Sequence, residues 1–264
     1  MGFEIYHGTP HTVWVPIVDL DTIYIGQLVA CQVNEGIVPL GTASGANDTT
    51  GKKVPMGVVV GLNLAIPSYD STFKTDKITD ASPLNSTVDY RLLEGKHPKG
   101  DTAAYAKVAI ITAETILKGP IYNAAFGTAM VLGTVTTGDA NGVSCTVNTL
   151  EVAGVAGLAS VYFRTGNCKG VYRVTDDSSA TAVTWDKATP RAVAVGDTLV
   201  RANGLRIFGP SYTQFDSESM YINSAAALTT DYFGIDVIAL DLSEASKEYV
   251  IFKFNADHFC LKRA

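Results

Sequence analysis

The stretch from Thr22 to Asn63, TIYIGQLVACQVNEGIVPLGTASGANDTTGKKVPMGVVVGLN, decides the fold class. Its two ends, TIYIGQLVACQ and VPMGVVVGLN, are rich in β-branched residues, which suit a pleated and partly buried surface. The segment between them, Thr42–Lys53, carries turn-forming residues without an apolar period. We therefore expect two β-strand arms joined by a glycine-rich loop on the surface.

This loop does not match a phosphate-binding loop. Such a loop needs a helix N-terminus directly after it, whereas Lys52 and Lys53 lead into a strand-like run. Gly57 and Gly61 within that run indicate a β-bulge or a close approach of the backbone. We interpret the loop as a surface feature that touches a neighbouring subunit.

Strand patterns continue along the rest of the chain. TGDANGVS, residues 137–144, predicts a hairpin, and GVYRV and YVIFKF alternate between two faces. In YVIFKF, we expect the face made of Val250, Phe252 and Phe254 to be core. Tyr105–Leu117 is expected to be one strand, with a helix as the competing interpretation, and Ser217–Leu228 is the candidate for a short helix.

The predicted fold is mainly β, with two β-barrel or β-sandwich modules and at most one or two short helices. Residues 1–21 are expected to form an extended arm, because Pro10 and Pro16 confine them to loops or sheet edges. Gly119–Pro120 is the clearest break in the middle of the chain. It gives an N-terminal β-barrel-like domain over residues 22–118 and a C-terminal β-sandwich-like domain over residues 119–264.

Composition narrows the classes of partner. The chain has 264 residues, of which 47% are hydrophobic and only 17% charged, against about 25% charged in an average globular protein. A low charge fraction is a weak sign of surface covered in an assembly. The formal net charge of −6 argues against a nucleic-acid-binding surface. We also expect no membrane-spanning segment and no signal peptide, so the protein would be made and folded in cytoplasm.

We find no pattern for a catalytic, cofactor or metal site, and we expect no enzymatic activity. Pro10 lies between His7 and His11 and prevents the helix that would make them a metal pair. The four cysteines lack zinc-ligand spacing, although a disulfide between Cys145 and Cys168 stays open. The remaining histidines and cysteines are His97, His258, Cys31 and Cys260.

Two weaker patterns leave alternatives open. Asp176, Asp177 and Asp186 could bind calcium or act in a hydrolase, but VTDDSS is more typical of a turn between strands. Scattered aromatic residues could line a sugar-binding face, although such residues are more often core or interface. These aromatic residues are Trp14, Trp185, Tyr69, Tyr162 and Tyr172.

The arms and the loop together resemble a known type of protein. The run YIGQLVACQ (24–32), GIVPLGTASG (36–45) and VPMGVVVGLN (54–63) is similar to β-barrel modules of capsid decoration, or cement, proteins of tailed phages. LASVYFRTGNCKGVYRVTDDSSATAVTWDKATP (158–190) also resembles phage structural proteins. The chain is longer than small cement proteins, so it would need a second β domain.

The resemblance implies a structural virion protein that decorates and stabilises a phage capsid by binding the lattice of the major capsid protein. It also implies a homotrimer on the capsid surface, with no direct contact to nucleic acid or membrane. The alternative is a carbohydrate-binding fibre or spike module, an adhesin. A hydrolase on a β scaffold is a third and weaker interpretation.

Overall fold

The computed structural model describes residues 2–17, 22–32, 36–41, 55–62, 77–79, 105–122, 130–148, 159–176, 181–216, 218–223 and 233–255. Within these ranges the chain is all β and contains no helix, as the sequence predicts. The strands are β1 (Glu4–His7), β2 (Thr12–Pro16), β3 (Thr22–Tyr24), β4 (Leu28–Gln32), β5 (Gly36–Pro39), β6 (Pro55–Leu62), β7 (Lys77–Thr79), β8 (Tyr105–Ile110), β9 (Ile116–Tyr122), β10 (Leu132–Thr137), β11 (Ser144–Val147), β12 (Ser160–Phe163), β13 (Gly170–Asp176), β14 (Ala182–Trp185), β15 (Thr198–Ala202), β16 (Gly209–Phe215), β17 (Ile222–Asn223), β18 (Phe233–Asp241) and β19 (Tyr249–Phe254).

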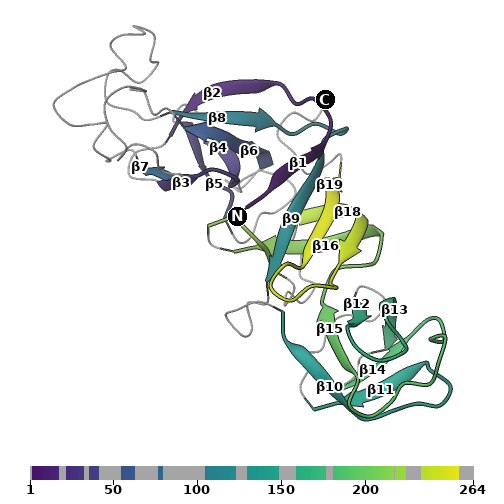
Figure 1. Cartoon of the computed structure of the whole chain (residues 1–264). Helices are drawn as coiled ribbons and strands as arrows, with labels where there is room; N and C mark the ends of the chain where they lie inside the picture. Colours follow the sequence, from purple (N-terminus) through teal and green to yellow (C-terminus); the bar gives the residue numbers. More distant parts are fainter. Residues whose placement is uncertain are drawn as a thin grey trace, which may run out of the picture.

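A five-stranded sheet of order β2-β8-β6-β4-β5 contains the two predicted arms (Figure 1). The arms pair as antiparallel strands β4 and β6, with Leu28 opposite Val58. The predicted bulge is present, because the register between β6 and β8 shifts between Val59 and Gly61. Gly57 is needed for a close approach, since a Cβ there would lie 2.4 Å from the carbonyl oxygen of Ala109. The loop over residues 42–53 lies outside the described residues.

A closed six-stranded barrel, β10-β11-β14-β13-β12-β15, occupies the other end of the molecule (Figure 1). Its first hairpin, β10–β11, is the one predicted from TGDANGVS. The alternation of GVYRV is also confirmed, since Tyr172 and Val174 pack towards the barrel core while Arg173 is exposed. Trp185 fills the centre of this core, where its ring contacts that of Phe163 at a centroid distance of 5.3 Å.

The third sheet lies between these two modules and has the order β1-β9-β17-β16-β18-β19 (Figure 1). The last strand in this order, β19, also pairs with β9, so the sheet curls back on itself. Val250, Phe252 and Phe254 of β19 are buried as predicted. Phe3, just before β1, packs edge-on against Phe252 at 6.0 Å.

The Gly119–Pro120 pair, which we expected to interrupt the chain, lies inside strand β9. Proline is tolerated there because β1 pairs with residues 116–118 and β17 with residues 121–122, so residue 120 pairs with neither of these two strands. On β19, Pro120 lies opposite Tyr249, and the amide of the next residue, Ile121, donates to the carbonyl of Glu248 at 3.0 Å. Gly119 makes room for Phe3, whose ring would lie 2.3 Å from a Cβ at this position. The predicted domain boundary after residue 118 therefore falls within a strand.

Two local predictions were wrong. Tyr105–Leu117 contains the strand β8 and the start of β9, separated by a turn. The turn is held by hydrogen bonds between Thr112 and Thr115, in one of which the Thr112 amide donates to Thr115 Oγ1 at 3.0 Å. The described part of the predicted helix Ser217–Leu228 is a turn followed by β17. Asp216 accepts from the amide of Glu218 at 3.2 Å, as a helix cap would, but it also accepts from the amide of Met220 at 2.6 Å, and the chain then pairs with β9.

The segment predicted as an arm forms strands β1 and β2, which pair with β9 and β8. It therefore runs along two sheets of its own chain, and β2 is an edge strand, the position in which Pro16 is tolerated.

One hydrophobic cluster joins the three modules. It contains Leu28 of the five-stranded sheet, Phe215 of the middle sheet and Val200 of the six-stranded barrel. We call this barrel the inserted barrel, because its strands lie in the chain between β9 and β16 of the middle sheet. The barrel and the five-stranded sheet also have separate cores of their own. The three modules are therefore packed together through apolar side chains.

A tyrosine-lined pocket as candidate functional site

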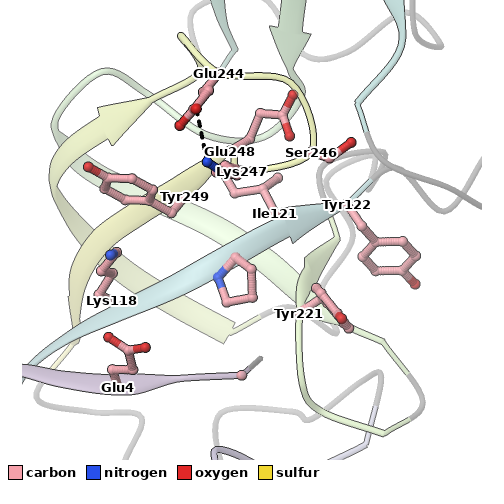
Figure 2. Close-up of a pocket in the computed structure, with 12 residues that line it drawn as sticks. Glu4, Lys118, Ile121, Tyr122, Tyr221, Glu244, Ser246, Lys247, Glu248 and Tyr249 are labelled. Carbon is pink, nitrogen blue, oxygen red and sulfur yellow. Dashed lines mark hydrogen bonds and ion pairs between the residues drawn. The ribbon is translucent and has the colours of Figure 1, made fainter.

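A pocket of about 710 Å³ lies along β9, beside β1, β17, β19 and the turn between β18 and β19 (Figure 2). Gly119–Pro120 lies at the pocket, because Pro120 and Ile121 line it. Here the pairing of β9 with β1 stops and its pairing with β17 begins. The turn contributes Glu244, Ser246 and Lys247. Ser246 has a left-handed backbone, with φ at 61°, which is uncommon for a residue other than glycine.

Tyrosines stand on two opposite sides of the pocket (Figure 2). On one side, Tyr122 and Tyr221 meet edge to face with their centroids 5.9 Å apart. On the other side, Lys118 Nζ lies 4.4 Å from the centre of the Tyr249 ring, and the Tyr249 hydroxyl bonds to Asp241. Both rims are therefore held by contacts within the protein.

Tyr122 and Tyr249 are neutral hydrogen-bonding groups. Burial raises the pKa of Tyr122 above its ordinary value, and the nearby carboxylate of Asp216 raises it further. Burial also raises the pKa of Tyr249, with a further contribution from its hydrogen bond to Asp241. Phenol hydroxyls in this state can donate and accept hydrogen bonds at neutral pH.

The charged groups of the pocket balance one another. Lys247 pairs with Glu244 at 2.9 Å at the exposed edge. Glu248 is buried and pairs with Arg164, which reaches in from the inserted barrel. Glu4 lies opposite Lys118 in the register of β1 and β9. With Glu248 paired to Arg164, the remaining charged groups of the lining are two glutamates and two lysines.

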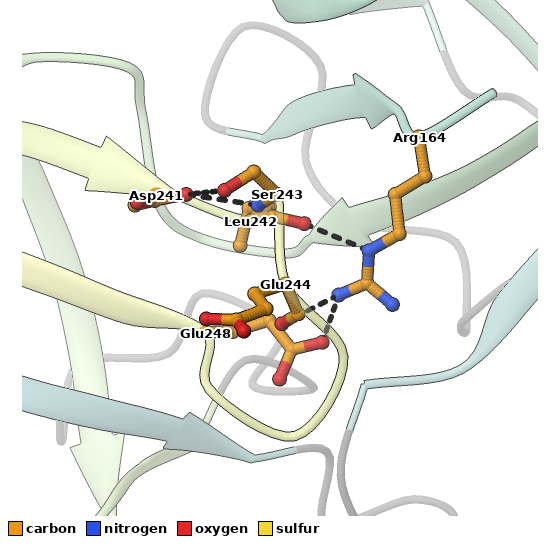
Figure 3. A network of polar contacts seen from close by, with 6 residues as sticks. All are labelled: Arg164, Asp241, Leu242, Ser243, Glu244 and Glu248. Carbon is orange, nitrogen blue, oxygen red and sulfur yellow. Dashed lines mark hydrogen bonds and ion pairs between the residues drawn. The ribbon is translucent and has the colours of Figure 1, made fainter. Parts of the chain in front are cut away.

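Arg164 fixes the wall behind the pocket (Figure 3). Its Nε donates to the carbonyl of Leu242 at 2.8 Å, and its Nη2 donates to the carbonyl of Glu244 at 3.3 Å and to the carboxylate of Glu248. The other oxygen of that carboxylate, Oε2, is buried without a hydrogen-bond partner among the described residues. A single side chain of the inserted barrel thus holds the turn that forms one side of the pocket.

The five-stranded sheet carries a second notable surface on its outer face. Trp14 of β2 lies opposite Lys107 of β8, which lies opposite Gly61 of β6. Trp14 is 54% exposed, and Val60, in the bulge beside Gly61, is 43% exposed. We call the group Trp14, Val60, Gly61 and Lys107 the Trp14 surface.

The aromatic residues considered from sequence do not form one sugar-binding face. Trp14 is exposed, but Trp185 is buried in the barrel core and its Nε1 donates to the carbonyl of Gly142 at 2.9 Å. Tyr162 and Tyr172 lie on neighbouring strands but pack into different clusters. Tyr69 lies outside the described residues.

The remaining candidates are also dispersed. Asp176 and Asp186 are exposed near paired strands β13 and β14, and Asp177 lies outside the described residues. His7 and His11 are exposed, and His97 and His258 lie outside the described ranges. In the part of the chain that the structure describes, no three His, Cys, Asp or Glu residues group as a metal site would require.

Cys145 and Cys168 are buried thiols and do not form the disulfide that the sequence left open. Cys168 Sγ donates instead to the carbonyl of Arg191 at 3.1 Å.

The pocket itself was missed from sequence. Its tyrosines come from β9, from β19 and from the residue just before β17, and these segments meet only through non-local pairing, of which β9–β17 is parallel. The one local signal was Gly119–Pro120, which we interpreted as a break.

No protein-family description matches this chain, and no curated protein or solved structure matches it either. Among the residues described here there is no helix with the length and apolarity needed to cross a membrane.

Proposed function

We propose that this protein is a structural component of a virion, a capsid decoration protein that stabilises a tailed-phage capsid by binding the lattice of its major capsid protein. The proposal extends the sequence resemblance, and the all-β barrel architecture is compatible with it. The observation that carries it is the exposed Trp14. A large apolar ring on a sheet face is typical of a surface that a partner covers.

The Trp14 surface has the features of a small interface centre. The aliphatic part of the Lys107 side chain lies beside Gly61, so it adds apolar surface next to the exposed Trp14 and Val60. Lys107 lies between them and provides one charge for orientation. Tryptophan is among the residues that most often dominate the energy of an interface.

The test is co-sedimentation with shells of the major capsid protein from the same genome, followed by electron microscopy. We expect the wild type to decorate the shells as a trimer, and Trp14→Ala to weaken binding by about 30-fold, as for an interface hot spot. Val195→Ala, at a 70% exposed apolar residue of the inserted barrel, is the matched control. A wild-type protein that stays monomeric and never co-sediments with shells would refute the proposal.

A further inference from the structure

We infer that the tyrosine-lined pocket beside β9 is a binding site for a neutral, short oligosaccharide. The site is separate from the Trp14 surface, and the inference does not depend on capsid binding. It would also supply what the fibre or spike alternative requires, at residues other than those considered from sequence.

The first argument is the placement of the rings. Tyr221 is 37% exposed and is held against Tyr122, so it offers an open ring at low cost in conformational entropy. Tyr249 forms the opposite rim and is fixed by Lys118 and Asp241 (Figure 2). Sugar rings have apolar C–H faces with hydroxyls around the edge, and tyrosine presents an apolar ring with a polar tip.

The second argument is charge. Among the lining residues, the two carboxylates Glu4 and Glu244 are matched by the two ammonium groups Lys118 and Lys247, and the third carboxylate, the buried Glu248, is paired with Arg164 behind the wall. Asp216 and Asp241 interact with Tyr122 and Tyr249 but do not line the pocket. An anionic or cationic ligand would find no net charge of opposite sign. A neutral ligand with many hydroxyl groups can instead donate to the carboxylates and accept from the ammonium groups.

The third argument is shape. A volume of about 710 Å³ lies within the usual range of about 300–1,000 Å³ for small-ligand pockets. Tyr122 of β9 and Tyr249 of β19 lie on opposite sides of the pocket, so a bound ring can contact an aromatic side chain on either side (Figure 2). The left-handed Ser246 adds an uncommon backbone conformation to the wall, and such conformations concentrate at ligand sites.

The experiment titrates the full chain with maltotriose, cellotriose, mannotriose and tri-N-acetylchitotriose, using saturation-transfer NMR and then calorimetry. We expect at least one trisaccharide to bind. Tyr221→Ala should weaken that binding by about tenfold, because it removes an aromatic contact, whereas Tyr221→Phe should retain most of it. Phe208→Ala is the control, since Phe208 is 71% exposed and does not line this pocket. Thermal melts establish that each variant is folded.

Three results would overturn the inference. The first is that none of the four trisaccharides binds at about 10 mM, a concentration that detects even millimolar affinity. The second is binding that Tyr221→Ala and Phe208→Ala affect equally. The third is tighter, salt-dependent binding of a charged probe, 3′-sialyllactose or chitosan trimer, which would assign an ionic ligand. Capsid co-sedimentation of the Tyr221→Ala variant keeps this test separate from that of the Trp14 surface. We expect this variant to co-sediment with capsid shells as the wild type does.

Discussion

Replacing Arg164 with alanine should destabilise the protein strongly although the residue lies at a junction between modules. The Arg164 and Glu248 side chains are only 9% and 1% exposed. Without the guanidinium, the Glu248 carboxylate keeps its buried position and loses its cation. The Leu242 carbonyl also loses its donor, while water can replace the lost donor of the Glu244 carbonyl in the exposed turn.

The magnitude follows from these contacts. Breaking a buried ion pair by removing one partner costs about 3–5 kcal/mol. The lost hydrogen bond to the buried Leu242 adds about 1 kcal/mol. We therefore expect the free energy of unfolding to fall by about 4–6 kcal/mol in Arg164→Ala. The double variant Arg164→Met with Glu248→Leu should recover most of this loss, because apolar replacements of a buried pair are often neutral or stabilising.

Urea unfolding followed by tryptophan fluorescence and by circular dichroism measures this effect. The chain has two tryptophans, so a Trp14→Phe background leaves Trp185 as the reporter of the inserted barrel. Lys247→Ala is the control, because it breaks a pair whose side chains are 64% and 66% exposed, and such pairs contribute about 0–1 kcal/mol. A loss in Arg164→Ala no larger than in Lys247→Ala would refute the reasoning, since it would mean that the junction is hydrated.

Three further predictions concern the inserted barrel. Gly142→Ala should lower the free energy of unfolding, measured by chemical denaturation, by about 1–3 kcal/mol more than Gly196→Ala does. Both glycines have a positive φ (69° and 93°), but of the two only Gly142 has other atoms within 4 Å of the place where a Cβ would lie. Hydrogen bonds from the amides of Val143 and Asn141 hold the pKa of Asp139 below its usual value, so its stabilisation is present above the unfolded pKa of about 4 and is lost as pH falls through the folded pKa. Asp139→Ala should therefore flatten the acid limb of a stability–pH profile, and an unchanged limb would contradict this. Burial raises the pKa of Cys145 to about 12, so with the other thiols replaced by serine this thiol should react with Ellman's reagent only after unfolding; rapid labelling of the native protein would contradict it.

The parts of the fold that sequence predicted are those set by neighbouring residues. The pairing of β4 with β6, the β10–β11 hairpin and the buried face of β19 follow from alternation and turn chemistry over short segments. Gly57 was recognised as a site of close backbone approach, where a Cβ would clash with the carbonyl of Ala109, and Gly61 was recognised as part of a bulge. These features need no knowledge of distant residues.

The features that sequence missed depend on distant partners. Asp216 caps a turn as it would cap a helix, and only the pairing of β17 with β9 decides that a strand follows. Proline often ends a strand. Pro120 does not, because it lies between the residues of β9 that pair with β1 and those that pair with β17, so it interrupts neither pairing. The pocket could not be predicted, because its walls come from three parts of the chain, residues 2–4, 118–122 and 221–249, that lie about a hundred residues apart in sequence.

The inserted barrel enters and leaves through adjacent antiparallel strands, since Leu132 at the start of β10 lies opposite Val200 near the end of β15. Cα atoms paired in this way are only about 5 Å apart. This position in the chain is therefore suited to exchange of whole modules by recombination, because a different barrel with equally close ends could be grafted there without stretching the rest. A graft would still need an arginine equivalent to Arg164 and an apolar patch equivalent to Val200, so these two contacts define the minimum compatibility of any replacement.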